Sequence, residues 1–374
     1  MIFAGALHAK PLLDGFMVES DRSVNGDTGG SFQDIDLNQE SRSDILGEIV
    51  NALDRYAFPD AAAKAQNDIR QRLEQGGYGD IVSGHQFAET LTTQLQTLTC
   101  DRSVRVYFSP TPLPNLNADT PPTAEELAYQ QQQSQQRNFD INRVERLAGN
   151  IGFLQLYGFE PPEFAGETLA AAMICLAHTE GLIIDLRYNR GGSQAMVALL
   201  CSYLLPAYPP VHLSDVSWPA EERTQQSWTV PYVGGPRYLD RHVYVLIGPE
   251  TSTAAEEFAY NLKQLKRGTL IGETTAGKAN PGTGQRLHDH FWMFLPTGQV
   301  MNPITGENWE GSGVLPDFKV PEELALKTSH YMGLTDLSKK SQGLNPEINA
   351  ALETVKKQLD QMQQDLISQL RGLR

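Results

Sequence analysis

Three short segments of the sequence combine residue types that can carry out acyl-transfer chemistry. Residues 185–192 (DLRYNRGG) end in two glycines, which let a backbone approach a ligand closely. Residues 251–259 (TSTAAEEFA) offer hydroxyl groups directly before an expected helix, where capping is their commoner role. Residues 272–278 (GETTAGK) bring a lysine to the end of a glycine-rich turn. A hydroxyl needs a base to become a nucleophile, and a lysine kept neutral by burial can be that base.

An acyl-transfer site also needs donors for the oxyanion that forms when the hydroxyl attacks. The N–H of Gly191 or Gly192, together with that of Ala254, would supply two donors. Losing one such donor costs about 10²–10³ in rate. Ser252 and Thr253 are the hydroxyls beside these groups, and the β-methyl of a threonine restricts χ1 and crowds an attacking trajectory.

The expected secondary structure places all three segments near the ends of strands. Strands and helices alternate along this part of the chain, with strands at 150–159, 181–186, 242–248 and 269–272 and helices at 169–178, 193–205 and 253–264. The alternation predicts an α/β fold, in which loops at the carboxyl ends of strands converge. A β-hairpin region is predicted around residues 292–296 and the glycine-rich segment 306–317.

Composition divides the chain into five parts. Residues 1–40 show little periodicity and are predicted to be a poorly ordered leader, and 41–110 a small helical domain that ends in a strand. The Pro/Gln-rich segment 111–140 is predicted to be a solvated linker, with a short exposed helix as the alternative. Residues 141–325 are the α/β core, and residues 344–374 are an amphipathic C-terminal helix.

The C-terminal helix carries an apolar seam. Asn345 and Pro346 suit an N-cap and a first turn. Apolar residues then recur at a/d positions over nearly three heptads: Ile348, Leu352, Val355, Leu359, Met362 and Leu366. Three heptads are short for an isolated coiled coil, so two outcomes remain open. The helix either docks on its own chain or joins a homo-oligomer.

Charge and composition argue against several classes of partner. The chain has 30 basic and 45 acidic residues and a net charge of −15, so it should repel nucleic acid and anionic lipid. No apolar run approaches the roughly 18 residues that span a bilayer. The cysteines share no metal-ligand spacing, and His288 and His290 lack a third ligand, so no metal or other cofactor is expected. No basic residue precedes the first apolar stretch, which favours a cytoplasmic location over export.

Taken together, these motifs resemble the tail-specific, or C-terminal-processing, family of serine peptidases. The resemblance covers about residues 41–320 and is closest to the branch of the interphotoreceptor retinoid-binding protein. It includes LIIDLRYNRGG, TAAEEFAYNLKQLKRGTLIGETTAGKANPG and NPITGENWEGSGVLPD, in that order. It implies a crotonase-like ββα core with a small N-terminal helical domain, and peptide or protein substrates. No PDZ-like module is predicted, because only the linker separates the two domains.

The resemblance also implies roles for individual residues. The family's Ser-Ala-Ser-Glu pattern places Thr253 in the nucleophile slot, and Lys278 follows at the spacing of the family's general-base lysine. Ser252 is the neighbouring alternative nucleophile. Glu256 and Thr275 match two supporting residues around that dyad. The chain thus keeps the base and alters the nucleophile.

Departures from the family pattern leave two functions open. Glu310 matches the glutamate of a related Ser–His–Glu branch, but Gln155 stands where that branch has its histidine. Gln264 replaces an aspartate that some members carry in the same helix. Lys278 favours a peptidase that acts through a hydroxyl–lysine dyad. Thr253 and Gln155 favour the alternative, an inactive homologue that binds an apolar ligand or a peptide, and a scaffold assembled by the C-terminal heptads is a third hypothesis.

Overall fold

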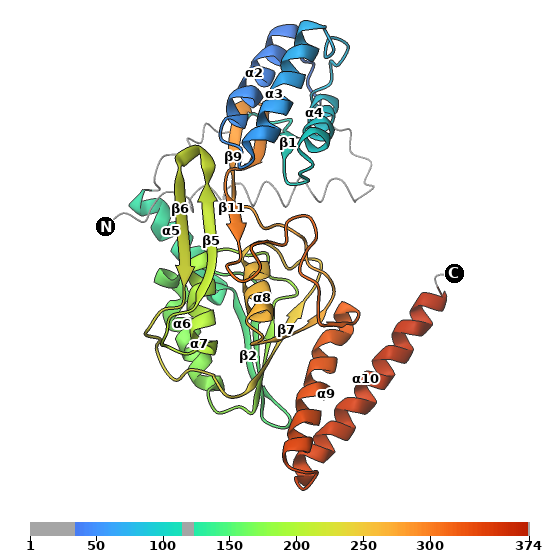
Figure 1. Cartoon of the computed structure of the whole chain (residues 1–374). Coiled ribbons are helices and arrows are strands. Elements are labelled where there is room, and N and C mark those ends of the chain that lie inside the picture. Colours follow the sequence, from blue (N-terminus) through green and yellow to red (C-terminus); the bar gives the residue numbers. More distant parts are fainter. Residues whose placement is uncertain (1–33, 114–122, 373–374) are drawn as a thin grey trace. The chain divides into compact units, whose positions relative to one another are not determined.

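The computed structural model describes residues 34–113 and 123–372 (Figure 1). Most of the leader predicted at 1–40 therefore lies outside the described residues. The chain divides into two compact units: unit 1 is Met1–Leu127, Val216–Gln225 and Asn280–Val300, and unit 2 is Ala128–Asp215, Gln226–Ala279 and Met301–Arg374. No helix within the described residues is both long enough and apolar enough to cross a membrane.

Unit 1 combines three helices with a small sheet. The helices are α2 (Gln39–Leu53), α3 (Pro59–Glu74) and α4 (Gly84–Thr99), and the sheet has the order β1 (Arg105–Phe108), β10 (Phe291–Pro296), β9 (Gly282–His288). The side chains of Asn38 and Ser83 cap α2 and α4. Apolar faces of the helices and the sheet meet in one core that includes Ile45, Phe87 and Phe291.

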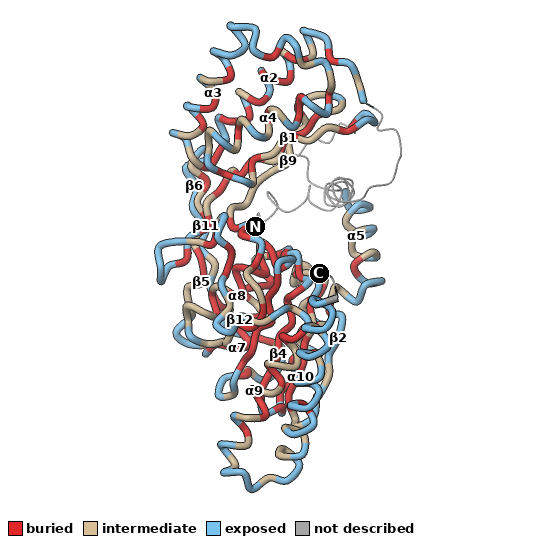
Figure 2. The backbone as a smooth tube through the Cα atoms, turned by 90° about the vertical axis from the view of Figure 1, so that its right-hand side faces the viewer, coloured by how far each residue is buried: buried red, intermediate tan, exposed pale blue. Residues whose placement is uncertain are grey.

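Unit 2 is built on a six-stranded sheet. Its order is β12 (Phe318–Lys319), β8 (Thr269–Gly272), β7 (His242–Ile247), β4 (Gly181–Asp185), β3 (Ile151–Leu156), β2 (Ile141–Leu147). Only β2 and β3 pair antiparallel; the other neighbours are parallel. The central strands are buried along nearly their whole length, as parallel strands covered on both faces must be (Figure 2).

Helices cover this sheet. Helices α6 (Pro162–Leu176), α7 (Gln194–Leu204) and α8 (Ala254–Gln264) pack in sequence beside one another. On one face, α9 (Glu322–Lys340) contributes Ala325 and Leu337 to a core with residues of the strands. The remaining elements are α5 (Ala124–Gln136), a sheet of β11 (Gln299–Met301), β5 (His212–Trp218) and β6 (Arg223–Trp228), and 3₁₀ turns at Asn138–Asp140 and Pro219–Glu221.

The α/β fold predicted from the sequence is confirmed, with three local differences. The predicted linker is helical over Ala124–Gln136, which is the alternative left open, while residues 114–122 lie outside the description. Helix α6 begins at Pro162, earlier than the predicted 169, because Pro161 and Pro162 open its first turn. The segment 306–317 contains no strand, and β10 pairs with β9 instead of with it.

The C-terminal helix docks on its own chain over its first half. Helix α10 (Pro346–Gly372) begins as predicted, with Asn345 Oδ1 accepting from the N–H groups of residues 347 and 348. It packs against α9 (Figure 1), where Val355 and Leu359 are buried. Further along the seam, Met362 and Leu366 are half-buried. The seam therefore serves intrachain packing first, and its outer end keeps apolar surface.

Candidate active site

The chain passes from β7 to α8 through a strained turn at Thr253. Thr253 has φ 53° and ψ −119°, an outlier conformation for a β-branched residue. Strain of this kind costs about 1–3 kcal/mol and gathers at functional sites. Two bonds hold the turn: Ser252 N–H to the Asn189 carbonyl (3.1 Å) and Thr253 N–H to Glu256 Oε2 (2.9 Å). A strained strand-to-helix turn that presents a hydroxyl has the geometry of a nucleophile elbow.

The two hydroxyls at this turn differ in access. Ser252 is buried, with 8% of the residue exposed, whereas Thr253 is half-buried. Both hydroxyls donate to the Arg190 carbonyl oxygen, Ser252 Oγ over 3.2 Å and Thr253 Oγ1 over 3.1 Å. Thr253 is therefore the more accessible hydroxyl of the pair.

The loop after β4 distinguishes between the two glycines predicted as oxyanion donors. Gly191 donates its N–H to Asn189 Oδ1 over 2.9 Å, so that group is already occupied. The N–H groups of Gly192 and of Ala254 have no bonded partner within the part of the chain that the structure describes. Gly192 and Ala254 are thus the pair whose donors are available to an oxyanion.

Gly191 also has to be a glycine because the turn at Ser252 and Thr253 comes so close to it. Its φ of 98° lies in the region that L side chains rarely adopt. A Cβ atom at this position would lie 1.6 Å from Thr253 Oγ1 and 2.9 Å from the Ser252 carbonyl oxygen. The Thr253 hydroxyl therefore rests directly on the backbone of the glycine loop.

Glu256 joins the turn at Thr253 to residues 275–278, the lysine loop. Its Oε2 accepts the Thr253 N–H and the Lys278 N–H, each over 2.9 Å, while its Oε1 accepts the Gly277 N–H (2.7 Å) and the Thr275 hydroxyl. Burial raises the pKa of Glu256, although these four donors favour the ionised form. Two bonds to one oxygen keep the Thr253 and Lys278 amide nitrogens within about 6 Å of each other, twice the length of one bond.

The side chain of Lys278 is exposed, in contrast to the burial predicted for a neutral base. Its ammonium group makes no hydrogen bond or ion pair with any residue that the structure describes. The sequence predicted burial because it treated desolvation as the means of lowering the lysine pKa. Here the Lys278 backbone is fixed by Glu256 while the side chain keeps its rotamer freedom.

Glu310 supports the same loop from the other side. Its Oε2 accepts the Ala279 N–H over 2.7 Å, one residue beyond Lys278. The backbone at residues 277–279 is thus held by two carboxylates. Glu310 acts here as a partner of the lysine loop, and no histidine accompanies it at position 155.

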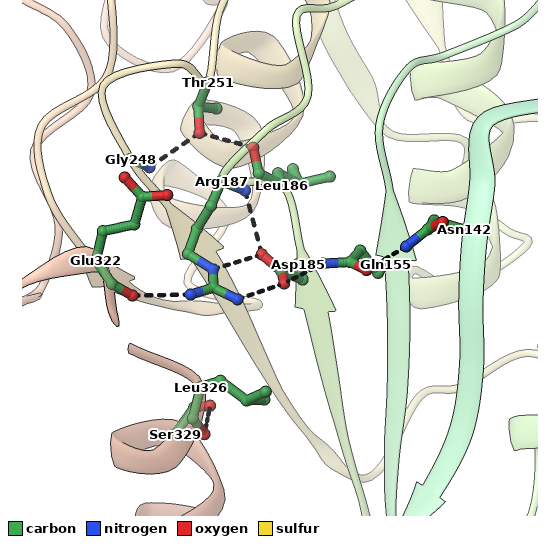
Figure 3. Close-up of polar contacts among 10 residues, drawn as sticks. All are labelled: Asn142, Gln155, Asp185, Leu186, Arg187, Gly248, Thr251, Glu322, Leu326 and Ser329. Atoms are coloured by element: carbon green, nitrogen blue, oxygen red, sulfur yellow. Dashed lines mark hydrogen bonds and ion pairs between the residues drawn. The ribbon is translucent and has the colours of Figure 1, made fainter. Parts of the chain in front are cut away.

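A network below these loops fixes the end of β4 (Figure 3). Asp185 receives two bonds of 2.8 Å from Arg187, and Gln155 Nε2 donates to it over 2.9 Å. Burial opposes the charge of Arg187, but its bonds to Asp185 prevail and raise the pKa of the guanidinium. Asn142 Nδ2 donates to Gln155 Oε1 over 2.6 Å, so both ends of the Gln155 amide serve the scaffold.

Thr251 connects the end of β4 to the turn at Ser252 and Thr253. Its hydroxyl donates to the Leu186 carbonyl over 2.7 Å and accepts the Gly248 N–H over 2.9 Å (Figure 3). The loops after β4 and β7 are therefore bonded to each other directly. Their relative position is fixed before any substrate arrives.

A small apolar cavity adjoins the glycine loop. Phe159, which lines it, donates its N–H to the Gly191 carbonyl over 2.8 Å and accepts the Ser193 N–H over 2.7 Å. The floor includes Met196 and Leu200 of α7, and the cavity volume is about 10 Å³, room for about one water-sized sphere. A substrate group that enters here would be small and apolar.

The sequence missed the part that Asn189 plays in this site. Asn189 is fully buried, and its side chain takes up the Gly191 N–H while its carbonyl holds Ser252. Asparagine side chains commonly bond the backbone two residues further on, so the Asn-x-Gly spacing was the available signal. The structure thus brings together residues 189–192, 252–256 and 275–278, three segments expected to converge because each lies at or just after the carboxyl end of a strand.

The chain matches two family models that follow each other along the sequence. Residues 39–142 match the N-terminal domain of Peptidase S41 in eukaryotic IRBP, and residues 150–320 match peptidase family S41. The first model covers the helical domain, and the second covers the segments that form the site.

Individual relatives agree with these matches. The carboxyl-terminal-processing protease of Synechocystis sp. is 29% identical over 175 residues, 47% of this chain and 39% of that protein. The tail-specific protease of Haemophilus influenzae is 27% identical over 158 residues, 40% of this chain and 21% of that protein. A solved structure of a candidate peptidase from Parabacteroides merdae shares the fold, with a TM-score of 0.53 and 18% identity over 76% of this chain and 90% of that chain.

These curated relatives are aligned over less than half of their own length. The two family models together cover the helical domain and the core with residues 189–192, 252–256 and 275–278. The resemblance inferred from the motifs is confirmed: the chain belongs to peptidase family S41 and carries an N-terminal domain of the type found in eukaryotic IRBP.

Proposed function

We propose that the protein is a peptidase that cleaves peptides or protein C-termini through a hydroxyl–lysine dyad. Thr253 Oγ1 attacks the carbonyl carbon of the scissile peptide bond, and the amine of Lys278, once it has turned in from solvent and lost its proton, accepts the hydroxyl proton. The N–H groups of Gly192 and Ala254 stabilise the resulting oxyanion. The same lysine then donates the proton to the leaving amine, and water hydrolyses the acyl-enzyme.

The observation that carries this proposal is the shared bond at Glu256. One oxygen of its carboxylate accepts both the Thr253 N–H and the Lys278 N–H over 2.9 Å. The four-carbon stem of a lysine is long and flexible enough to bring its amine to a hydroxyl across the resulting gap. The backbone arrangement thus supports a dyad even though the resting lysine side chain is exposed.

The resting hydroxyl has to turn before it can react. Thr253 Oγ1 donates to the Arg190 carbonyl over 3.1 Å, so rotation about χ1 must break that bond and present the proton to Lys278. In a threonine this rotation also moves the β-methyl group, which has to find room beside Gly191. We therefore expect the rotation of the Thr253 side chain, and not its backbone conformation, to limit the rate of the proposed attack.

Covalent labelling tests the proposal directly. A fluorophosphonate probe followed by peptide mapping should place the adduct on Thr253 in the wild type. The Thr253→Ala variant should lose the label, and Ser252→Ala, the matched hydroxyl in the same turn, should keep it. Labelling that disappears with Ser252→Ala and persists in Thr253→Ala would move the nucleophile by one residue.

The exposed side chain of Lys278 and the methyl group of Thr253 also favour a second function, that of a binding protein without catalytic activity. An inactive homologue that binds an apolar ligand or a peptide would tolerate both an exposed Lys278 and a methyl group at the nucleophile. The two functions separate in one experiment. A wild type that takes no label and cleaves no peptide in a diverse library, yet binds apolar ligands, belongs with the second.

A further inference from the structure

A second buried acid lies directly beside Glu256 on α8. Glu257 has 2% of its surface exposed. Its Oε1 accepts the Ser214 hydroxyl over 2.7 Å, and its Oε2 accepts Gln194 Nε2 over 2.9 Å. Whereas Glu256 reaches the lysine loop, Glu257 reaches α7 and β5.

This acid is held by neutral groups alone. No cation forms an ion pair with Glu257 within the described ranges, and the titratable group that faces it is the buried thiol of Cys201 on α7. Burial raises the pKa of Glu257, because the neighbouring hydroxyl and amide compensate only part of the lost hydration. An apolar side chain would fill the same space at a lower desolvation cost, so the stability of the fold does not account for a carboxyl group here.

The contacts of Glu257 connect the two helix starts that carry the oxyanion donors. Gln194 is the first residue of α7 and follows Gly192 by two residues, with Ser193 capping the helix between them. Glu257 belongs to the first turn and a half of α8, the helix whose first N–H is that of Ala254. The bond from Gln194 to Glu257 therefore joins α7 to α8 at residues two and three positions after the donors Gly192 and Ala254.

We propose that Glu257 is a positioning residue that sets the distance between the two oxyanion donors through its bond to Gln194. This inference rests on the proposed peptidase function. It assigns to Glu257 no contact with substrate: the carboxyl group holds α7 and α8 in register, and the donors act. Because a displaced donor is weakened and not removed, the loss should be smaller than the factor of about 10²–10³ known for deleting one donor.

The test compares three variants with the wild type. Glu257→Leu removes the bond and keeps the volume, Glu257→Gln can keep it through the amide, and Gln194→Met breaks it from the half-buried partner if Glu257→Leu does not fold. Asp101→Leu is the matched control, since Asp101 is also a buried acid held by a hydroxyl, that of Tyr56, in unit 1.

The readouts separate positioning from general stability. For Glu257→Leu and Gln194→Met we expect kcat to fall on the order of 10- to 100-fold while KM stays unchanged. Affinity for a peptide aldehyde, which forms a tetrahedral adduct, should fall in parallel, but affinity for the matching peptide alcohol should not. Glu257→Gln should keep the wild-type kcat. The variant that combines Glu257→Leu with Gln194→Met should lose no more kcat than either single variant, because both changes break the same bond. Asp101→Leu should lower Tm and leave kcat unchanged.

The outcomes distinguish this inference from the function on which it rests. A wild type that neither cleaves peptides nor binds the aldehyde refutes the proposed function, and this inference with it. A wild type that does both, with Gln194→Met and Glu257→Leu unchanged in kcat and aldehyde affinity, refutes the role of Glu257 alone. Equal losses of alcohol and aldehyde affinity would overturn it as well, because the site as a whole would then have collapsed.

Discussion

Replacing Thr253 with serine removes one methyl group from the most strained residue of the proposed site. The residue sits at φ 53° and ψ −119°, with its hydroxyl bonded to the Arg190 carbonyl over 3.1 Å. A Cβ atom on Gly191 would lie only 2.9 Å from Thr253 Cβ, so the space around this side chain is tight. Rotation about χ1 must bring the hydroxyl to Lys278, and in threonine the methyl group then moves into the space beside the glycine loop.

We predict that Thr253→Ser raises kcat/KM by about 10-fold. Relief of about 1.4 kcal/mol of crowding by the methyl group in the transition state corresponds to that factor. A fluorogenic peptide assay measures the change. Thr251→Ser is the matched control, because it removes a methyl group two residues away while its hydroxyl can keep both of its bonds.

The result that refutes this reasoning is equally concrete. If Thr253→Ser leaves kcat/KM unchanged or lowers it, crowding by the methyl group does not limit the reaction. If Thr253→Ala retains activity, residue 253 does not supply the nucleophile at all. Lys278→Ala should abolish activity in both the threonine and the serine background, since no other base is proposed for either hydroxyl.

Four further expectations follow from the contacts described above. Gly191→Ala should lower the free energy of unfolding by more than about 1 kcal/mol and abolish labelling by the fluorophosphonate. The control Gly47→Ala should do neither, because its new methyl group has nothing within 4 Å. Equal effects of the two variants on stability would contradict the close approach of Thr253 to Gly191. Met196→Ala should enlarge the cavity beside Phe159 and shift the preferred substrate residue before the scissile bond from alanine toward leucine by about 10-fold. Competition between two peptides that differ at this residue measures the shift. An unchanged ratio of cleavage would mean that the substrate residue before the scissile bond does not enter this cavity. Burial lowers the pKa of His330 below 6.5, so its contribution to stability is present above pH 6.5 and is lost as the pH falls through the lowered pKa. In His330→Gln the Tm should therefore fall less in acid than in the wild type. An equal fall of Tm in both proteins would contradict this. Deleting residues 344–374 should lower Tm, because Val355 and Leu359 leave α9, and light scattering should give the same number of chains per particle as for the full chain. Fewer chains per particle would reveal a homo-oligomer.

The strand–loop–helix units of the core could be predicted because their apolar patterns are nearly uninterrupted. The strands expected at 181–186 and 242–248 are β4 and β7, and the helix expected at 253–264 is α8. Helix α9 was not predicted, since polar or small residues interrupt its buried face. Ser329, His330 and Gly333 lie on that face. They hide the helical period that would otherwise mark the segment.

The glycine-rich segment 306–317 shows the opposite error. It was predicted, together with residues 292–296, as a hairpin region, but its turns bond the lysine loop: the Gly311 N–H donates to the Gly277 carbonyl over 2.9 Å. A Cβ on Gly277 would lie 3.0 Å from the Gly313 backbone nitrogen, so these glycines allow two loops to touch. Sequence pattern does not reveal a loop–loop contact of this kind, because it has no period.

The site itself could be predicted by residue type and could not be predicted by contact. The family resemblance pointed to Thr253 and Lys278, and residue type pointed to the glycine pair, but neither could say which glycine keeps its N–H available. That choice depends on the Asn189 side chain, which takes up the Gly191 N–H. Likewise, the exposure of Lys278 depends on loops that are distant in sequence, and so does the reach of Glu257 to Gln194.

The first turn of α8 explains how such distant segments can act as one site. Thr253 opens the helix, Glu256 binds the lysine loop, and Glu257 binds the start of α7. The lysine loop and the start of α7 are therefore positioned by two neighbouring residues in the first turn of this helix, while the Thr253 hydroxyl adds its own bond to the Arg190 carbonyl. Since these supporting contacts form around a threonine, we expect Thr253→Ser to keep them and to change the rate of the proposed reaction through the methyl group alone.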